Sequence, residues 1–161
     1  MSALATASVT IASPVGRLTL TERDGALIRL TWSEGSSSDW SGLLRRASQY
    51  IEAYFAGDLK IFDLPLAPEG TAFQKRVYAA MQRIPFGGTR RYGELAVELG
   101  SAARAVGGAC GSNPLPIVIP CHRVVAAGRG LGGFSGGTGV STKTWLLNHE
   151  GALPRRQLAL L

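Results

Sequence analysis

The sequence predicts a protein of the α+β class, with a small β-sheet domain followed by a helical domain. Apolar and polar residues alternate through much of the first third, whereas apolar residues recur at helical spacing from residue 71 onward. A proline-containing linker over residues 64–70 separates the two patterns. Since 161 residues suffice for two small domains, we expect an N-terminal domain at 1–66 and a C-terminal domain at 71–161.

The N-terminal domain is expected to contain three strands, at residues 9–12, 17–22 and 26–32, where the alternation is clearest. Turn sequences at 14–16 and at Asp24-Gly25 separate these segments. The first three elements therefore form consecutive hairpins.

A helix is expected over residues 40–56, with Asp39 as its N-cap and Gly57 as its stop. The apolar residues of this segment recur every three or four positions, as in an amphipathic helix. Residues 61–66 are compatible with one further strand.

The C-terminal domain begins with a predicted helix. Thr71 and Gln74 have the spacing of a capping box. An apolar stripe follows, made of Phe73, Val77, Ala80, Met81 and Ile84. The sequence Pro-Phe-Gly-Gly at 85–88 should end this helix.

Two short helices are expected next, at residues 92–99 and 102–110, joined by a tight turn at Gly100. Ser101 is the expected N-cap of the second one. This arrangement is typical of a helix-turn-helix. A last helix is predicted over 142–150.

Charge is distributed unequally between the two halves. Residues 1–70 contain six Lys and Arg against eight Asp and Glu, a balance of −2, whereas residues 71–161 contain eleven against three, a balance of +8. Such an excess indicates a polyanion partner, most commonly nucleic acid. A basic surface that only keeps the protein in solution is the alternative.

Several classes of protein are excluded or disfavoured. No apolar run approaches the ~20 residues that span a bilayer, and the first residues lack the pattern of a secretory signal. The two cysteines, Cys110 and Cys121, cannot form a disulfide framework. We therefore expect a cytoplasmic protein without a membrane partner.

The predicted helix at 102–110 contains two adjacent glycines, Gly107 and Gly108, each costing ~1 kcal/mol in a helix interior. Close packing against another helix would explain them, and so would close approach to a nucleic-acid groove. In the second case Arg104 is the one large side chain on a smooth face, and it could enter a base stack.

The candidate nucleophile is Cys121, between Pro120 and His122 at the end of an apolar segment. A cysteine reacts as the thiolate, and a neighbouring imidazole promotes this form directly or through a water. Glu150 could complete a Cys–His–acid constellation. The alternative is a buried cysteine that serves only as a small apolar residue.

No metal or cofactor is expected. The soft ligands lack the paired spacing of a zinc site, and they comprise Cys110, Cys121, His122 and His149. The glycines between residues 128 and 137 match neither the Walker nor the dinucleotide pattern.

Five motifs in register resemble the O6-alkylguanine-DNA alkyltransferases, also called methylated-DNA–protein-cysteine methyltransferases. They are Tyr92-Gly-Glu-Leu-Ala96, Ala102-Ala-Arg-Ala-Val-Gly107, Asn113-Pro114 with Pro120-Cys-His-Arg-Val124, Gly133-Phe-Ser-Gly-Gly137 and His149-Glu-Gly151. The resemblance covers residues 71–151. The N-terminal part resembles only the family's general layout, a small sheet domain with a ribonuclease-H-like arrangement.

The resemblance implies a DNA-repair transferase that flips O6-alkylguanine out of double-stranded DNA, bound through the minor groove. It transfers the alkyl group to its own cysteine, once and irreversibly. Cys121 would be the acceptor, His122 would deprotonate it through a water, and Glu150 would orient the imidazole. The protein would act as a monomer that can cluster on DNA.

The resemblance also assigns the remaining site residues. Asn113 would brace the active-site turn, Tyr92 would donate a proton near guanine N3, and Arg104 would intercalate. The surface around the intercalating side chain would be formed by Ala103, Ala105, Gly107 and Tyr92. The guanine pocket would be lined by Pro116, Val124, Phe134, Ser135 and Gly136.

Four positions depart from the family pattern: Gly88 replaces a common Glu, the turn at 100–102 is short, Phe134 replaces Tyr, and the segment 138–142 is long. Three other functions explain less of the sequence. A helix-turn-helix regulator leaves the segment around Cys121 without a role, and a cysteine hydrolase leaves the basic small-residue helix unexplained. A lesion-binding relative without activity would lack the nucleophile.

Overall fold

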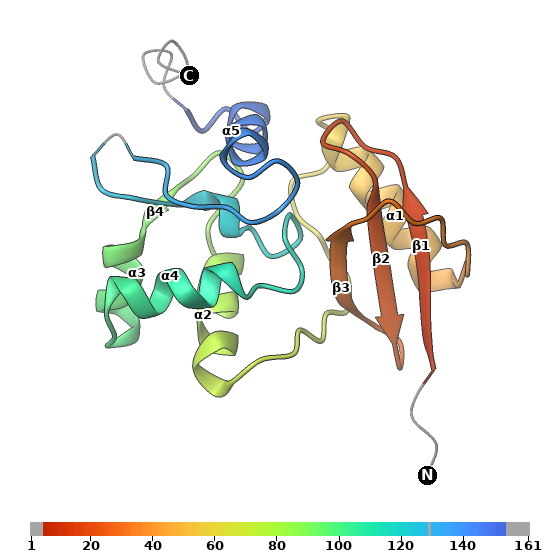
Figure 1. Cartoon of the computed structure of the whole chain (residues 1–161), viewed down its shortest axis with the longest axis horizontal. Helices are drawn as coiled ribbons and strands as arrows, with labels where there is room; N and C mark the ends of the chain where they lie inside the picture. Colours follow the sequence, from red (N-terminus) through yellow and green to blue (C-terminus); the bar gives the residue numbers. More distant parts are fainter. Residues whose placement is uncertain (1–4, 129, 154–161) are drawn as a thin grey trace. The chain divides into compact units, whose positions relative to one another are not determined.

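The structure is a computed structural model that describes residues 5–128 and 130–153 (Figure 1). It divides into two compact units, and the boundary between them in the sequence lies between Glu69 and Gly70. The first contains an antiparallel sheet and a helix, and the second is mainly helical. The predicted α+β class is confirmed.

The first unit is a three-stranded antiparallel sheet with the order β1-β2-β3. Its strands are β1 (Thr6–Ile11), β2 (Leu18–Arg23) and β3 (Ala26–Trp32). The β2–β3 turn consists of Asp24 and Gly25, with φ of 53° and 77°. Positive φ at both positions is the geometry of a two-residue type I′ hairpin, and this explains why Asp-Gly occurs here.

Helix α1 (Gly42–Phe55) packs on the sheet, as Figure 1 shows. Its N-cap is Ser41, whose hydroxyl accepts from Leu44 N at 3.0 Å, so the prediction of Asp39 was wrong. Asp39 is engaged by strand β1 instead. Its backbone N–H donates to Ser8 O at 2.9 Å, and its carboxylate accepts from Ser8 N at 3.3 Å.

The expected strand at residues 61–66 does not form. Only a parallel bridge between Leu27 and Leu66 is present, held by bonds from Leu27 N to Pro65 O at 2.9 Å and from Ala67 N to Leu27 O at 2.8 Å. Ile61 is 79% exposed, so it does not contribute to a buried strand face. A proline within the segment also removes one ladder donor.

The second unit contains four helices, a 3-10 turn and a two-stranded parallel pair of β4 with β5 among its described residues. In chain order they are α2 (Ala72–Gln82), β4 (Arg90–Arg91), α3 (Tyr92–Leu99), α4 (Ala103–Gly111), η1 (Cys121–Arg123), β5 (Val124–Val125) and α5 (Val140–His149). The capping box of Thr71 and Gln74 is confirmed. The β4–β5 pair has two residues per strand and no sequence pattern of its own.

Helices α3 and α4 pack on each other and are joined by three residues. Gly100 ends α3 in the left-handed region with φ of 64°, a conformation that glycine adopts without strain. The residue before α4 is Ala102, which makes no side-chain cap, so the expectation for Ser101 was wrong. Helix α5 begins at Val140 rather than at residue 142, and Glu150 follows as its C-cap.

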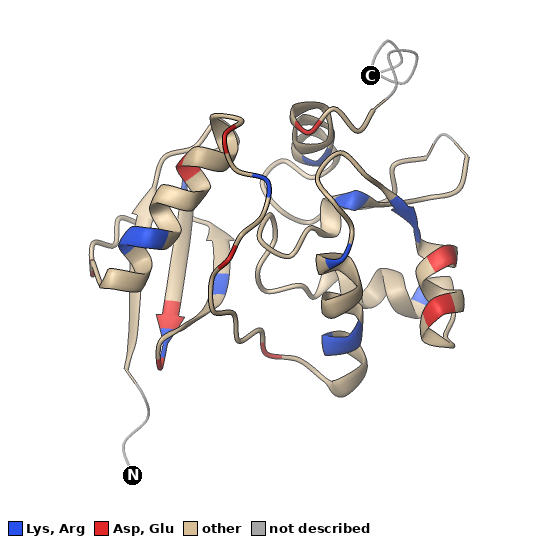
Figure 2. Ribbon diagram, turned by 180° about the vertical axis from the view of Figure 1, so that it is seen from behind, with Lys and Arg blue, Asp and Glu red and all other residues tan. Residues whose placement is uncertain are grey.

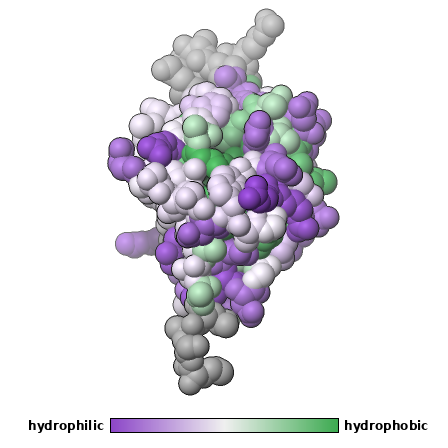
Figure 3. All heavy atoms as spheres, turned by 90° about the vertical axis from the view of Figure 1, so that its right-hand side faces the viewer, coloured by the Kyte–Doolittle hydropathy of each residue, from purple (hydrophilic) through white to green (hydrophobic). Residues whose placement is uncertain are grey.

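Surface character agrees with a globular fold. Figure 3 shows one face on which hydrophilic side chains surround smaller apolar areas. Among residues 5–128 and 130–153, the large apolar side chains that are exposed come from separate segments, and they are Trp40, Ile61, Val97 and Val140. Within the described residues, no helix has the length and apolar character needed to cross a membrane.

Candidate active site and DNA-facing helix

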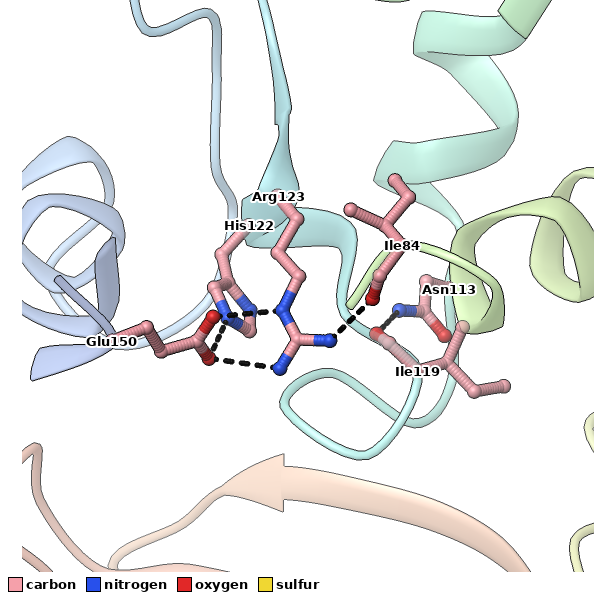
Figure 4. A network of polar contacts seen from close by, with 6 residues as sticks. All are labelled: Ile84, Asn113, Ile119, His122, Arg123 and Glu150. Atoms are coloured by element: carbon pink, nitrogen blue, oxygen red, sulfur yellow. Dashed lines mark hydrogen bonds and ion pairs between the residues drawn. The ribbon is translucent and has the colours of Figure 1, made fainter. Parts of the chain in front are cut away.

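The turn before Cys121 is braced by the side chain of Asn113 (Figure 4). Its amide donates to Ile119 O at 2.8 Å, and its carbonyl oxygen accepts from Leu115 N at 3.0 Å. A backbone bond from Ile119 N to Leu115 O at 2.8 Å closes the same loop. One side chain thus fixes both ends of the segment that leads into the candidate nucleophile.

Ile117 lies in the middle of this turn with φ of 74°. A β-branched residue rarely adopts this left-handed conformation, which costs on the order of 1–3 kcal/mol. The side chain is buried, and the bonds of Asn113 hold the backbone on both sides of it. The turn is therefore held in a strained geometry by its surroundings.

Cys121 is the first residue of η1 and is buried. Burial raises the pKa of its thiol above the ordinary value, while a hydrogen bond with Asn113 and the charge of Lys143 act in the opposite direction. The resting residue is therefore a protonated thiol. A base is needed to make it nucleophilic.

His122 and Glu150 form a buried hydrogen-bonded pair, with 2.6 Å between Nε2 and Oε2 (Figure 4). Because a carboxylate only accepts, Nε2 carries the proton and Nδ1 presents a lone pair. Nδ1 is buried without a hydrogen-bond partner among the described residues. Burial lowers the pKa of His122 and Glu150 opposes this shift, so the imidazole is a neutral base at pH 7.

Arg123 completes this network from the other side of the carboxylate. Its Nε donates to Glu150 Oε1 at 2.7 Å, and its Nη2 donates to Glu150 Oε2 at 3.1 Å. Its Nη1 donates to Ile84 O at 2.6 Å, beyond the end of α2 (Figure 4). Arg123 therefore holds the Glu150 carboxylate in the orientation in which it accepts from His122.

Tyr92 is the first residue of α3 and is half-buried. Gly132, with φ of 77°, approaches it so closely that an added Cβ would lie 2.7 Å from the phenol oxygen. Burial raises the pKa of Tyr92 to about 12. The hydroxyl therefore keeps its proton at neutral pH and can donate a hydrogen bond.

Lys143 on α5 has no exposed surface and points at Tyr92. Its ammonium donates to Val124 O at 2.7 Å, to Gly133 O at 3.2 Å and to the Tyr92 hydroxyl at 3.4 Å. Burial lowers its pKa to about 8. This charged residue links α5, β5, α3 and the segment between β5 and α5.

The expected pocket residues lie on three segments around this lysine. Val124 is buried on β5, and Pro116 is half-buried in the braced turn. The other three lie between β5 and α5, where the chain is held by Lys143 at Gly133 and by Thr142 at Thr138; they are Phe134, Ser135 and Gly136. Ser135 is exposed, whereas its two neighbours are half-buried.

Helix α4 has one buried face and one open face. The open face contains Ala103, Arg104, Ala105 and Gly108, all exposed. A Cβ added at Gly108 would meet nothing within 4 Å, and one at Gly107 would meet only a Tyr92 ring carbon at 4.0 Å. Internal packing therefore does not require either glycine, which removes the first of the two explanations considered for them.

The buried face of α4 includes Val106, Ala109 and Cys110. The Cys110 thiol lies 3.6 Å from the sulfur of Met81 on α2. Burial raises its pKa to about 12, so this cysteine is an unreactive packing residue.

Comparisons with known proteins identify the family to which this chain belongs. The family model described as 6-O-methylguanine DNA methyltransferase, DNA binding domain, matches residues 72–152, and that of the ribonuclease-like domain of the same family matches residues 8–68. The chain belongs to the 6-O-methylguanine DNA methyltransferase family. The resemblance seen in the sequence is confirmed.

Relatives match over most of their length. A methylated-DNA–protein-cysteine methyltransferase of Methanosarcina acetivorans is 43% identical over 150 residues, covering 87% of this chain and 95% of the relative. A crystal structure of the Mycobacterium tuberculosis O6-methylguanine methyltransferase has a TM-score of 0.80 at 40% identity, covering 97% of this chain and 99% of that one. A structure of Mycobacterium tuberculosis OGT in complex with DNA has a TM-score of 0.80 at 43% identity, covering 95% and 98%.

The family's DNA-binding domain contains the basic half of this chain. Figure 2 shows Lys and Arg on α2 and on β4. Arg83, directly after α2, and Arg90 on β4 are both paired with Glu98, at 3.4 Å and 3.6 Å. Arg104 on α4 forms no ion pair with any described residue. Within residues 5–128 and 130–153, no cluster of three His, Cys, Asp or Glu could hold a metal ion.

The sequence predicted that His122 and Glu150 lie together, but it gave no role to two charged residues that contact them or the neighbouring Tyr92. The structure pairs His122 with Glu150 as expected, yet neither Arg123 nor Lys143 was given a role. Arg123 stands inside the quoted motif at the end of an apolar segment, and this position was a usable signal of burial. Lys143 has no comparable signal, since a lysine in a helix is normally exposed.

Proposed function

We propose that this methyltransferase repairs DNA by moving an alkyl group from guanine O6 to the sulfur of Cys121. The observation that carries this assignment is the buried His122–Glu150 pair next to a buried, protonated thiol. A neutral imidazole with a free Nδ1 lone pair is the form required of a general base. The membership of the family supports the same reaction.

The reaction is a displacement at carbon. His122 takes the thiol proton through a bridging water, and the thiolate attacks the alkyl carbon of the flipped base. The S–C bond forms as the C–O6 bond breaks, and the electron pair remains on guanine. Tyr92 then donates its proton at N3. The braced turn of Asn113 contributes by holding the sulfur in line, since alignment of reacting atoms supplies much of such a barrier.

DNA engagement would use the open face of α4 in the minor groove. Arg104 would enter the stack in place of the flipped nucleotide, flanked by small residues that allow the helix backbone to approach. Gly107 and Gly108 fit this role because nothing inside the protein presses on them. Flipping costs a few kcal/mol, and less for a lesion whose pairing is already weakened.

The product is a thioether on Cys121, which has no thiol-exchange route back. Each molecule would therefore act once. It would do so as a monomer, inside the cell where its DNA substrate lies. The pocket segment at Phe134, Ser135 and Gly136 would contact the base. Val124 and Pro116 would form the opposite wall.

The test is intact-protein mass spectrometry after incubation with a duplex that contains O6-methylguanine. We expect a gain of one methyl group per protein, located on Cys121, and no gain in Cys121→Ser. Cys110→Ser is the matched control and should be methylated like the natural protein. Methyl transfer to another residue, repeated turnover, or binding without a change in mass would each contradict the proposal.

A further inference from the structure

The segment of residues 132–139, which leads into α5, contains five glycines, and three of them have a left-handed backbone. Their φ angles are 77° at Gly132, 52° at Gly137 and 72° at Gly139. Glycine adopts such angles without strain, but it also loses more conformational freedom on folding than any other residue. The segment therefore needs contacts that hold it in one conformation.

Thr142 on α5 provides such a contact at the end of the segment. Its hydroxyl accepts a hydrogen bond from Thr138 N at 2.9 Å and lies 3.1 Å from the Thr138 hydroxyl oxygen. Thr142 is 4% exposed, whereas Thr138 is exposed. A buried hydroxyl of the helix thus holds an exposed part of the segment.

This bond runs from the helix back to the chain before it. The N-cap of α5 is Gly139, which makes no side-chain cap. An N-cap side chain normally accepts from an N–H inside the first turn and so stabilises the helix. Here Thr142, inside the first turn, accepts from the residue that precedes the N-cap. The bond therefore orders the segment rather than the start of the helix.

The backbone closes the same turn. Gly139 N donates to Gly136 O at 2.8 Å, and Gly139 O accepts from Thr142 N at 3.0 Å. A Cβ added at Gly139 would lie 3.4 Å from Phe134 O. The part of the segment that Thr142 holds is therefore folded back against the residues that we propose to contact the base.

The beginning of the segment is tied separately. Gly133 O accepts from Lys143 Nζ at 3.2 Å, and the same ammonium donates to Val124 O at 2.7 Å. Val124 belongs to the opposite wall of the proposed pocket, so one nitrogen spans the two walls at this end. Thr142 acts at the other end, and it contacts none of the groups that we propose to react.

We infer that Thr142 is a specificity-determining residue that fixes the segment 132–139, sets the width of the base pocket and favours methyl over bulkier alkyl groups. The inference rests on the proposed function, because it takes the base to lie against this segment. It assigns Thr142 a positioning role in substrate binding, with no part in the proton transfers or in the attack by sulfur.

The physical basis is a difference between small and large substrates. A methylated base fits the pocket as it stands, so a wall that is already ordered binds it without an ordering cost. A benzyl group needs the wall to move outward, which breaks the bond between Thr142 and Thr138. Without that hydroxyl, the methylated base must order a loose wall, while the benzylated base no longer has a bond to break. The two substrates therefore respond differently to the same substitution.

The experiment measures single-turnover transfer to Cys121 from the free bases O6-methylguanine and O6-benzylguanine, which need no flipping. Thr142→Val should raise the concentration of O6-methylguanine that gives the half-maximal rate by about 5- to 10-fold, the size of one lost buried hydrogen bond. The maximal rate should stay the same, because no reacting group is touched. The rate with O6-benzylguanine should not fall, so the benzyl-to-methyl ratio should rise by about the same factor. Thr142→Ser keeps the hydroxyl and should retain the natural ratio.

Thr144→Val is the matched control, since it makes the same chemical change two residues further along α5. Among the described residues, the Thr144 side chain forms no hydrogen bond with residues 132–139, so the ratio should not change. Thr138→Val is a second test at an exposed position, where the fold is not at risk. It removes only the hydroxyl contact and leaves the backbone bond to Thr142, so the ratio should rise by about 2- to 3-fold. Thermal unfolding is measured on every variant.

Equal changes with the two bases in Thr142→Val, or no change with either, would overturn the inference and leave the proposed function intact. The same would follow if Thr144→Val shifted the ratio as strongly, or if Thr142→Ser behaved like Thr142→Val. If Thr142→Val does not fold, an unchanged ratio in Thr138→Val overturns the inference. Absence of methyl transfer from an O6-methylguanine duplex to the natural protein would instead contradict the proposed function itself.

Discussion

The two units of this protein bury different kinds of side chain. Among the described residues, the only buried polar residue of the first unit is Thr21, whose hydroxyl bonds to that of Ser8 at 2.9 Å. The second unit buries five polar or charged residues: His122, Arg123, Thr142, Lys143 and Glu150. The first unit is thus held together chiefly by apolar packing, and the second also by a buried network of hydrogen bonds and ion pairs.

This difference indicates where function constrains the fold. Buried charges contribute little net stability compared with apolar groups of the same size, whereas a single missing partner is strongly destabilising. The stability of the second unit is therefore more sensitive to the loss of a single charged partner than that of the first unit. We expect variants of its buried charged residues to lose stability and activity together, and variants of the apolar core of the first unit to lose stability alone.

Glu150→Gln should have the largest effect of the substitutions considered below. It removes the carboxylate that accepts from both His122 and Arg123 and leaves Arg123 buried without its charge partner. We expect a loss of about 3–5 kcal/mol in the free energy of unfolding, and a transfer rate lower by about 10²- to 10⁴-fold. Urea denaturation and single-turnover kinetics measure the two losses. A full transfer rate would show that the network is only structural.

Leu30→Ala tests the expectation that variants of the first unit lose stability alone. Leu30 on β3 is 2% exposed, and the substitution should cost about 2–5 kcal/mol of unfolding free energy. The transfer rate of the folded protein, measured at a temperature well below the transition, should not change. If the rate falls along with the stability, the two units are not separable in the way proposed.

Arg104→Ala should affect DNA handling without affecting stability. Its side chain is exposed on α4, so the unfolding midpoint should stay within error. Loss of the group that holds the stack open should raise the cost of flipping by a few kcal/mol, which slows transfer from duplex DNA by about 10²-fold. Transfer from the free base O6-methylguanine, which needs no flipping, is the internal control. Equal losses with both substrates would contradict the intercalating role.

Gly108→Ala should have the smallest effect of these substitutions. Unlike the others, it should increase the free energy of unfolding. Alanine is the better helix former by about 1 kcal/mol, and its methyl group meets nothing inside the protein. The variant should be more stable but bind duplex DNA more weakly. Gly111→Ala, at the last residue of α4 and equally unobstructed, is the control that should leave DNA binding unchanged. Unaltered DNA affinity in Gly108→Ala would favour a helix face that does not contact the groove.

Local patterns were sufficient for most of the fold. The alternation of residues 26–32 and the Asp24-Gly25 turn identified a strand and its hairpin, and the Thr71–Gln74 spacing identified a helix start. Each of these depends on residues close in sequence. The N-cap predicted at Asp39 was wrong because the partner of Asp39, Ser8, lies 31 positions away, and no local signal opposes an aspartate before a helix.

The same limit applies to the site. Cys121, His122 and Glu150 could be proposed from the sequence because the motif that contains them is specific. The contacts of Arg123 reach Glu150 and Ile84, 27 and 39 positions away, so only the tertiary structure shows that this charge is enclosed. The contact between Lys143 and Tyr92 spans 51 positions and is hidden from the sequence for the same reason.

The strained conformation of Ile117 has a consequence for the life cycle of the protein. Enzymes that turn over must open to release what they have made, and stiff active sites slow that step. Here the alkyl group stays on the protein, so no transferred group has to be discharged before another cycle. A turn kept rigid by Asn113 carries no kinetic disadvantage in such a reaction. In a molecule that is used once, a turn that aligns the sulfur can therefore be rigid without slowing a later cycle.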